Sequence, residues 1–280
     1  MRIYYQNNFG QSVDFMGWPY NLASSTDLHD YVWNYDNRSR MNPKITRFYR
    51  ELTARKMEIS VSAGTMGEYN KALEYLLEVT ERDVLNLTPG RLYVDEYYLP
   101  CYIHKSQKTS WMEGAAFLVN TFSVVSEKGA WIRESKSLFS ARGQAPAANE
   151  DDLYLDYPFE YPYDYASIVL GRVVQNQGYA SADFELTICG PCKDPEVIIA
   201  GHGYKVGTTL ESGELLLINS LQRRVYKVLV NGEEVNQFHL RNRESYIFEK
   251  IPEGECAVVW NGSFAFYVTI FEERSEPRWT

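Results

Sequence analysis

The chain is poor in cysteine, and it lacks an apolar run of membrane-spanning length. Its 280 residues include four cysteines, too few to staple a chain of this size, so we expect reduced thiols and a fold that rests on hydrophobic cores. No run approaches the roughly 20 apolar residues that cross a bilayer, so we expect no membrane partner. The first residues lack the apolar segment of a signal peptide, so we expect synthesis in the host cytoplasm without export by that route.

Positive charge is also scarce. The sequence has 28 Lys and Arg against 37 Asp and Glu, a formal net charge of -9. Proteins that bind nucleic acid through its backbone neutralise phosphates with Lys and Arg. We therefore expect no DNA binding and no specific nucleic-acid partner.

Tyrosine, in contrast, is abundant. The 22 tyrosines favour a β-rich protein that meets partners, because tyrosine suits pleated, half-exposed surfaces and protein interfaces. Hydrophobic residues make up 45% of the chain and charged residues 23%, as in ordered globular proteins. A length of 280 residues favours two domains, each with its own core.

Strand patterns dominate the first half of the chain. One helix is predicted over residues 67–85, with Leu73, Leu76, Leu77 and Val84 on the face that covers an open sheet. Residues 95 and 96 suggest a tight turn between two strands. The predicted strand regions are 2–20, as a hairpin, 57–62, 91–94, 97–104 and 115–126.

A composition shift marks the predicted domain boundary. Residues 137–152 are small and polar without a sustained period, which indicates a linker between a first domain, 1–136, and a second domain, 153–280. Residues 153–165 then interleave tyrosines with acids and two prolines. Proline cannot donate to a strand ladder, so this segment is an edge strand or extended connector, serving domain packing or a binding stripe.

The second half predicts a β-sandwich, because short strand patterns alternate with turns. Asn231-Gly232 and Asn261-Gly262 fit two-residue type I′ turns, which need positive φ at both positions. Residues 251–254 form another turn. The predicted strands are 168–174, 182–188, 215–218, 225–230, 246–248, 256–260 and 265–271.

The sequence Cys189-Gly190-Pro191-Cys192 spells the redox motif of thioredoxin-like proteins. That chemistry needs a helix after the motif, but residues 193–201 bring a proline, β-branched residues and a glycine. We therefore interpret the motif as a structural turn, with redox activity and a metal site as alternatives. A zinc site would need further ligands from Cys101, Cys256 or the histidines, and no second closely spaced pair exists.

No other pattern supplies a catalytic centre. The histidines at 29, 104, 202 and 239 stand alone, and the adjacent carboxylates 95/96 and 272/273 point to opposite faces of a strand. No nucleophile elbow, phosphate-binding loop or dinucleotide fingerprint occurs. We therefore expect a protein that is not an enzyme, with no catalytic, cofactor-binding or metal-binding residues and no cofactor.

Several segments together resemble the distal tail proteins of siphophages, which form the hub of the baseplate. The resemblance covers most of the chain. In the first half it is carried by residues 90–103, by Trp111 and by residues 124–131, and in the second half by residues 161–165, 186–192, 213–218 and 251–254.

The resemblance implies a mainly β fold with two β-sandwich-like domains. The first would be tail-tube-like with one flanking helix and would close into a hexameric ring, and the second would be galectin-like. Implied partners are other copies of the chain, the major tail tube protein, the tape measure protein, the tail-tip hub protein and, in some phages, a receptor-binding protein. The implied location is the tail tip of a phage or prophage particle.

Two further hypotheses follow from the sequence. Ring contacts are expected from residues 91–104 and the first strand, because alternating tyrosines suggest an exposed sheet edge. The main rival function is a carbohydrate-binding β-sandwich that mediates adsorption to a cell surface, with Trp260, Phe264, Phe266 and Tyr267 as an aromatic platform. Packing in the core is the simpler explanation for those four residues.

Overall fold

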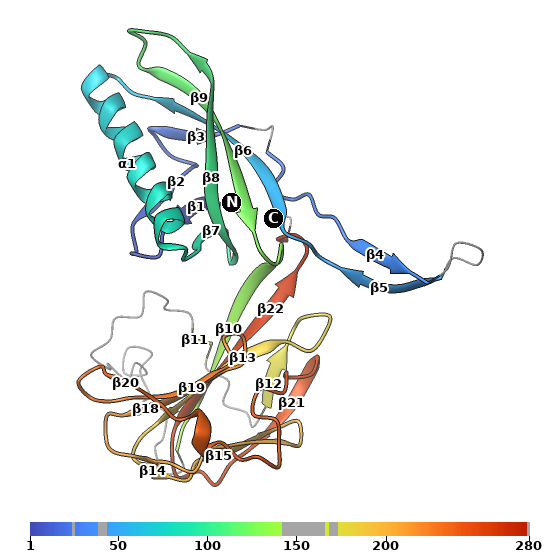
Figure 1. Ribbon diagram of the computed structural model, residues 1–280. Helices are drawn as coiled ribbons and strands as arrows, with labels where there is room; N and C mark the ends of the chain where they lie inside the picture. Colours follow the sequence, from blue (N-terminus) through green and yellow to red (C-terminus); the bar gives the residue numbers. More distant parts are fainter. Residues whose placement is uncertain (24–25, 39–43, 142–165, 168–172, 279–280) are drawn as a thin grey trace. The chain divides into compact units, whose positions relative to one another are not determined.

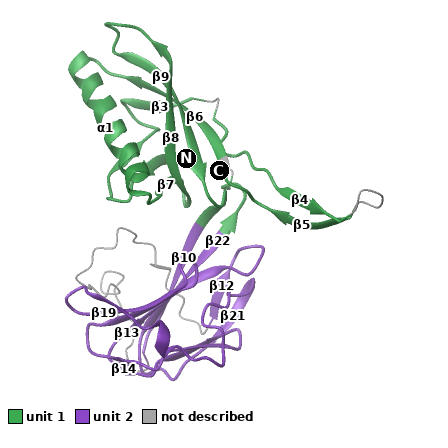
Figure 2. Ribbon diagram, viewed as in Figure 1, with its two compact units in different colours: residues 1–132, 273–280 green, residues 133–272 purple. Residues whose placement is uncertain are grey.

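The computed structural model describes residues 1–23, 26–38, 44–141, 166–167 and 173–278 (Figure 1). It divides into two compact units, residues 1–132 with 273–280 and residues 133–272 (Figure 2). The chain passes between them within strands β10 (Trp131–Phe139) and β22 (Phe266–Arg274).

This division differs from the predicted boundaries in three places. Residues 133–136 belong to the second unit, residues 137–139 continue β10 instead of starting a linker, and residues 273–280 belong to the first unit. These differences arise because the chain crosses within strands, so that no change of composition marks the crossing. The rest of the predicted linker, 142–152, and the tyrosine-rich segment 153–165 lie outside the described residues.

The fold is mainly β, as predicted. In the first unit, one run of antiparallel neighbours is β2-β1-β7-β8, and β8 continues through β9 and β6 to β3. Its elements are β1 (Ile3–Gln6), β2 (Ser12–Asp14), β3 (Tyr20–Leu22), β4 (Asn34–Asn37), β5 (Ile45–Tyr49), β6 (Thr53–Ser62), α1 (Met66–Asn86), β7 (Gly90–Val94), β8 (Tyr97–Trp111) and β9 (Phe117–Ser126).

The predicted local features of this unit are largely confirmed. β1 and β2 form the expected hairpin, with Tyr5 opposite Val13. The turn between β7 and β8 is tight, with Val94 opposite Tyr97 and Asp95 at φ 51°. The Asp95 carboxylate accepts a hydrogen bond from the backbone N–H of Arg2 at 2.7 Å, which joins this turn to β1.

Helix α1 covers the sheet of the first unit, and its sequence explains both of its ends (Figure 1). Thr65 and Glu68 form a reciprocal capping box, and Leu87 ends the helix in the left-handed conformation. The buried face consists of Tyr69, Ala72, Leu76, Val79, Thr80 and Asp83. The prediction was wrong for Leu77, which is 57% exposed. Leu77 follows the buried Leu76 by one position and therefore points away from the helix face that packs on the strands.

A buried carboxylate ties α1 to the first hairpin. Asp83 has no exposed surface and accepts hydrogen bonds from the hydroxyl of Tyr5 at 2.6 Å and from the backbone N–H of Asn8 at 2.9 Å. Gly90 packs so closely here that an added Cβ would collide with Asp83 and Tyr5. The start of β7 therefore has room for glycine alone.

The second unit consists of two main sheets around one hydrophobic core, which is the predicted β-sandwich. One sheet contains β22-β13-β18-β19-β20 and the other β12-β21-β15-β16. The galectin-like assignment stays a prediction. Besides β10 and β22, the elements are β11 (Ala166–Ser167), β12 (Val173–Asn176), β13 (Asp183–Cys189), β14 (Cys192–Lys193), β15 (Glu196–Ile199), β16 (His202–Lys205), β17 (Thr209–Leu210), β18 (Leu215–Asn219), β19 (Arg224–Val228), β20 (Glu234–Asn236), the 3₁₀ helix η2 (Phe238–Leu240) and β21 (Gly254–Val259).

Five predicted strands of this unit correspond to β13, β18, β19, β21 and β22. The prediction for residues 246–248 was wrong. Ile247 and Phe248 are buried, but this short apolar run lies in a loop and belongs to no strand. Of the predicted strand 168–174, only residues 173 and 174 are described, and they begin β12.

The type I′ turn predictions were also wrong. Gly232 has φ 85° and Gly262 has φ 79°, but neither preceding asparagine has positive φ. The Asn231 side chain instead accepts a hydrogen bond from the backbone N–H of Glu233 at 3.0 Å, and Asn261 accepts one from Ser263 at 2.9 Å. Both asparagines thus stabilise Asx turns inside longer loops.

Candidate functional site and interaction surfaces

The Cys-Gly-Pro-Cys motif is a turn between β13 and β14, as interpreted from the sequence. Gly190 donates its N–H to the carbonyl of Glu214 at 2.9 Å, and an added Cβ there would run into the carbonyl oxygen of Glu211. Burial, and then the nearby Cys189, raise the pKa of Cys192 to about 11. A thiol that stays protonated at neutral pH is a poor nucleophile, so the geometry favours a structural role.

The zinc candidates do not converge. Cys101 lies in the core of the first unit, and burial raises the pKa of its thiol to about 12. Cys256 lies in the core of the second unit, and His202 Nε2 is 2.9 Å from the carbonyl oxygen of Tyr246. Within the described ranges, no three His, Cys, Asp or Glu side chains gather as a metal site.

The paired carboxylates have separate structural partners. Asp95 caps the β7–β8 turn. Glu272 is buried and accepts two hydrogen bonds from Arg133, from Nε at 3.1 Å and Nη2 at 2.6 Å. Glu273 lies instead near Arg50 and Lys128, at 3.8 Å and 3.9 Å. Glu272 and Glu273 thus point away from each other, as expected for a strand, whereas residues 95 and 96 form the turn between β7 and β8.

The expectation that residues 91–104 and the first strand form ring contacts is contradicted. β1 pairs with β2 and β7, and β7 pairs with β1 and β8, so neither strand is a free edge. The tyrosines that suggested an edge are interior: Tyr93, Tyr97 and Tyr98 are at most 5% exposed. Their alternation reflects packing within one copy of the chain.

A different part of the first unit projects from the sheet. Strands β4 and β5 form a separate two-stranded ribbon, named here the β4–β5 arm and comprising residues 31–38 and 44–49, which extends away from the rest of the unit (Figure 1). Tyr35 and Phe48 are both 57% exposed, and Val32 is 64% exposed. A lone ribbon of two strands is marginal in water, so its apolar side chains call for a partner surface.

The base of the β4–β5 arm is held in place. The guanidinium of Arg50 lies 4.3 Å from the ring centre of Trp33, and both side chains donate hydrogen bonds to the hydroxyl of Ser275. The arm was not predicted from the sequence. Its signal was two short β-prone stretches, 31–35 and 45–49, on either side of a polar segment.

The end of the β8–β9 hairpin is a second apolar projection. Trp111 and Met112 are 65% and 68% exposed, and Phe117 is 46% exposed. Residues 104–111 of β8 are exposed throughout, so the hairpin continues beyond the core that supports its base. Both projections belong to the first unit.

The predicted aromatic platform of the second unit is part of its core. Phe264 and Phe266 are 3% and 0% exposed, and Trp260 packs edge-on against Phe266 at 5.1 Å. The simpler explanation, packing in the core, is therefore confirmed for Phe264, Phe266 and Trp260. Tyr267 lies under the ammonium group of Lys136, 4.4 Å from its ring centre.

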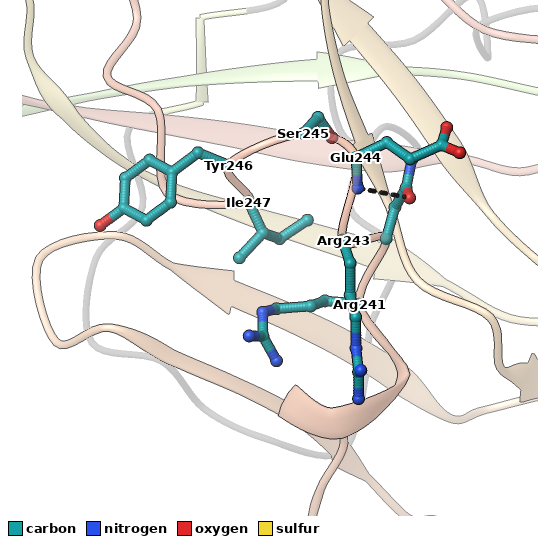
Figure 3. Close-up of a pocket in the computed structure, with 7 residues that line it drawn as sticks. Arg241, Arg243, Glu244, Ser245, Tyr246 and Ile247 are labelled. Atoms are coloured by element: carbon teal, nitrogen blue, oxygen red, sulfur yellow. Dashed lines mark hydrogen bonds between the residues drawn. The ribbon is translucent and has the colours of Figure 1, made fainter.

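The second unit has a surface hollow elsewhere, of about 390 Å³ (Figure 3). One continuous segment, residues 241–247, lines it, and Arg241, Arg243 and Tyr246 are among its side chains. The loop is held by its own contacts: the backbone N–H of Glu244 donates to the side chain of Asn242 at 3.0 Å. No sequence motif indicated this hollow.

Comparison with solved structures matches almost the whole chain. The crystal structure of the Dit protein of phage SPP1, described as a paradigm of the hub adsorption apparatus in phages that infect Gram-positive hosts, is matched over 98% of both chains with a TM-score of 0.60 and 12% identity. A chain of the phage P2 baseplate in its activated conformation with Ca is matched over 99% of both, with a TM-score of 0.63 and 11% identity.

The chain has the fold of these phage baseplate proteins. A phage p2 baseplate with Sr gives the same result, a TM-score of 0.60 at 13% identity over 99% of this chain and 100% of the other. No family profile and no curated protein sequence matches. The shared baseplate fold thus includes both units and is retained at an identity too low for sequence matching.

Proposed function

We propose that this chain is a structural protein of a phage or prophage tail tip. The observation that carries the proposal is the likeness to the hub and baseplate proteins, which extends over 98% or more of the chain and of each match. Because the likeness includes both units and leaves almost no residues of either chain unmatched, it favours the same kind of assembly role. It also matches the resemblance found in the sequence.

We further propose that six copies close into a ring that joins the tail tube to the baseplate. Exposed apolar side chains on the β4–β5 arm and the β8–β9 hairpin support self-association, because isolated projections of this kind are stabilised by burial on a neighbour. A projection that docks on a different surface of the next copy makes a heterologous contact, which closes into a ring when the rotation permits.

The same proposal assigns no catalytic step to the chain. The cysteine motif is a turn in which burial raises the pKa of Cys192, and the carboxylates of Asp95 and Glu272 have structural partners. The expected neighbours are the major tail tube protein, the tape measure protein, the tail-tip hub protein and a receptor-binding protein. No helix in the described part of the chain is long and apolar enough to cross a membrane.

The mass of the purified chain in solution tests the ring. Six copies of a 32.4 kDa chain weigh about 194 kDa, and light scattering after size exclusion should give that mass across a range of concentrations. A mass of 32.4 kDa at every concentration would contradict a ring that closes by itself.

Replacing one exposed aromatic side chain of the arm tests which contact holds the six copies together. Phe48→Ser should lower the mass while changing the free energy of unfolding by less than about 0.5 kcal/mol, because Phe48 is exposed in the single chain. Val230→Ser is the matched control, since Val230 is an equally exposed apolar residue of the second unit. A fall in mass for both variants, or for neither, would show that the arm is not the contact.

A further inference from the structure

We propose that the hollow lined by residues 241–247 binds a saccharide that carries an anionic group, a carboxylate or a phosphate. Its volume of about 390 Å³ lies in the range of small-ligand sites. The site lies wholly within the second unit, so it does not depend on the proposed ring.

Arg241 supplies a fixed cationic group. Its Nη1 donates to the carbonyl oxygen of Phe238 at 2.8 Å, and its guanidinium lies 3.8 Å from the centre of the Phe238 ring. Phe238 is itself stacked on the buried Phe248. A guanidinium held in this way loses little freedom on binding, and its planar fork matches a carboxylate or phosphate.

Arg243 adds a second cation on the same segment (Figure 3). It is exposed and forms no ion pair within the described residues. In a chain with a net charge of -9, two arginines two positions apart are a local reversal of sign. This reversal favours an anionic ligand.

Tyr246 is the evidence for the sugar part of the ligand. The Tyr246 ring is 54% exposed and rests edge-on against Phe248 at 5.9 Å, so it presents a supported aromatic surface. Such a surface suits the apolar face of a sugar ring.

Saturation-transfer NMR on the whole chain tests the proposal, with trigalacturonic acid and glucose 1-phosphate as anionic probes and maltotriose as the neutral probe. Binding of the uronic acid alone identifies a carboxylate ligand, and binding of the sugar phosphate alone identifies a phosphate ligand. Either result supports the site. Binding of maltotriose as tight as that of the anionic probes, or no binding of any probe, overturns it.

Variants then place the binding in the hollow. Arg243→Gln and Tyr246→Ala change exposed side chains, and each should weaken binding of the anionic probe roughly fivefold or more. Arg224→Gln and Tyr179→Ala are matched controls, because both residues are exposed in the same unit but do not line the hollow. An unchanged affinity in both test variants would overturn the assignment. Since these variants leave the projections of the first unit intact, the ring mass stays unchanged and the two proposals fail separately.

Discussion

Buried carboxylates have different kinds of partner in the two units. In the first unit, Asp83 is surrounded by neutral donors, the hydroxyl of Tyr5 and the backbone N–H of Asn8. In the second unit, buried carboxylates face cations: Glu272 faces Arg133, and Asp183 faces Lys250 at 2.8 Å. Removing Glu272 therefore takes a charged partner from the mostly buried guanidinium of Arg133, whereas the donors around Asp83 carry no charge.

The units also differ in what they expose. Most of the exposed large hydrophobic side chains among the described residues belong to the first unit, where two projections carry many of them. The second unit buries Phe184, Phe264 and Phe266 in its sandwich core and exposes a small, charged hollow. The contrast is the basis of the two proposals, self-association through the first unit and ligand binding by the second.

The largest effect is expected at Glu272. Glu272→Gln should lower the free energy of unfolding by about 3 kcal/mol, because it removes the negative charge of a buried carboxylate that accepts two hydrogen bonds from Arg133. Asp83→Asn in the first unit should cost less, about 1–2 kcal/mol, because the two donors that lose the carboxylate are uncharged. Denaturant titration of each variant measures the difference.

Glu273→Gln is the control for this prediction. Its carboxylate is a third exposed and 3.8–3.9 Å from its cations, so the change should stay below about 0.5 kcal/mol. Equal losses for the Glu272 and Asp83 variants would remove the contrast between the units.

Two glycines test the packing of each unit separately. Gly90→Ala and Gly190→Ala should each cost about 2–3 kcal/mol, because the new Cβ collides with buried side chains at Gly90 and with backbone at Gly190. Calorimetry should show the loss in the unit that carries the change. Gly207→Ala, with its nearest atom 3.6 Å away, is the control, and a similar loss there would contradict the steric account.

Glu214 makes the free energy of unfolding of the second unit depend on pH in the acid range. Hydrogen bonding from the backbone N–H of Glu211, together with the Lys227 ammonium, lowers the pKa of this carboxyl. Its contribution is therefore present above the ordinary pKa of 4.5 and is lost as the pH falls below it.

Glu214→Gln should thus destabilise the chain by about 1 kcal/mol at neutral pH, with the two stability curves converging in acid. The exposed Glu78, paired with Arg82 on helix α1, is the first-unit control, and Glu78→Gln should change stability by less than about 0.5 kcal/mol. A gap that does not narrow as the pH falls below 4.5 would contradict the assignment to Glu214.

The smallest effect concerns thiol chemistry. With a pKa of about 11, Cys192 should react with iodoacetamide about a hundredfold more slowly near pH 8 than a thiol with a pKa of 9.0. Cys101 of the first unit should remain unlabelled until that unit unfolds, since it is fully buried. Mass spectrometry of labelled peptides, with Cys192→Ser as the control, measures both rates. Fast labelling of Cys192 at neutral pH would revive the redox interpretation.

The sequence predicted those parts of the fold that depend on local patterns. Helix α1, the first hairpin and most strands of the second unit carry clear periodicity, capping or turn residues. The same logic failed for Leu77 and for residues 246–248, because the packing of neighbouring strands decides which apolar positions are buried.

Surfaces were less predictable than elements. Alternating tyrosines in β7 and β8 suggested a free edge, but the long-range pairing of β7 with β1 buries them. The β4–β5 arm and the hollow at residues 241–247 depend on where the chain leaves its core, which no local pattern records. The baseplate resemblance covered both units without indicating either feature.

Electron microscopy of the purified chain tests the central claim most directly. Class averages should show a ring with sixfold symmetry, and the rings should be lost in Phe48→Ser but retained in Val230→Ser. Single particles without rotational symmetry, or rings that persist unchanged in Phe48→Ser, would contradict the assignment of assembly to the β4–β5 arm of the first unit.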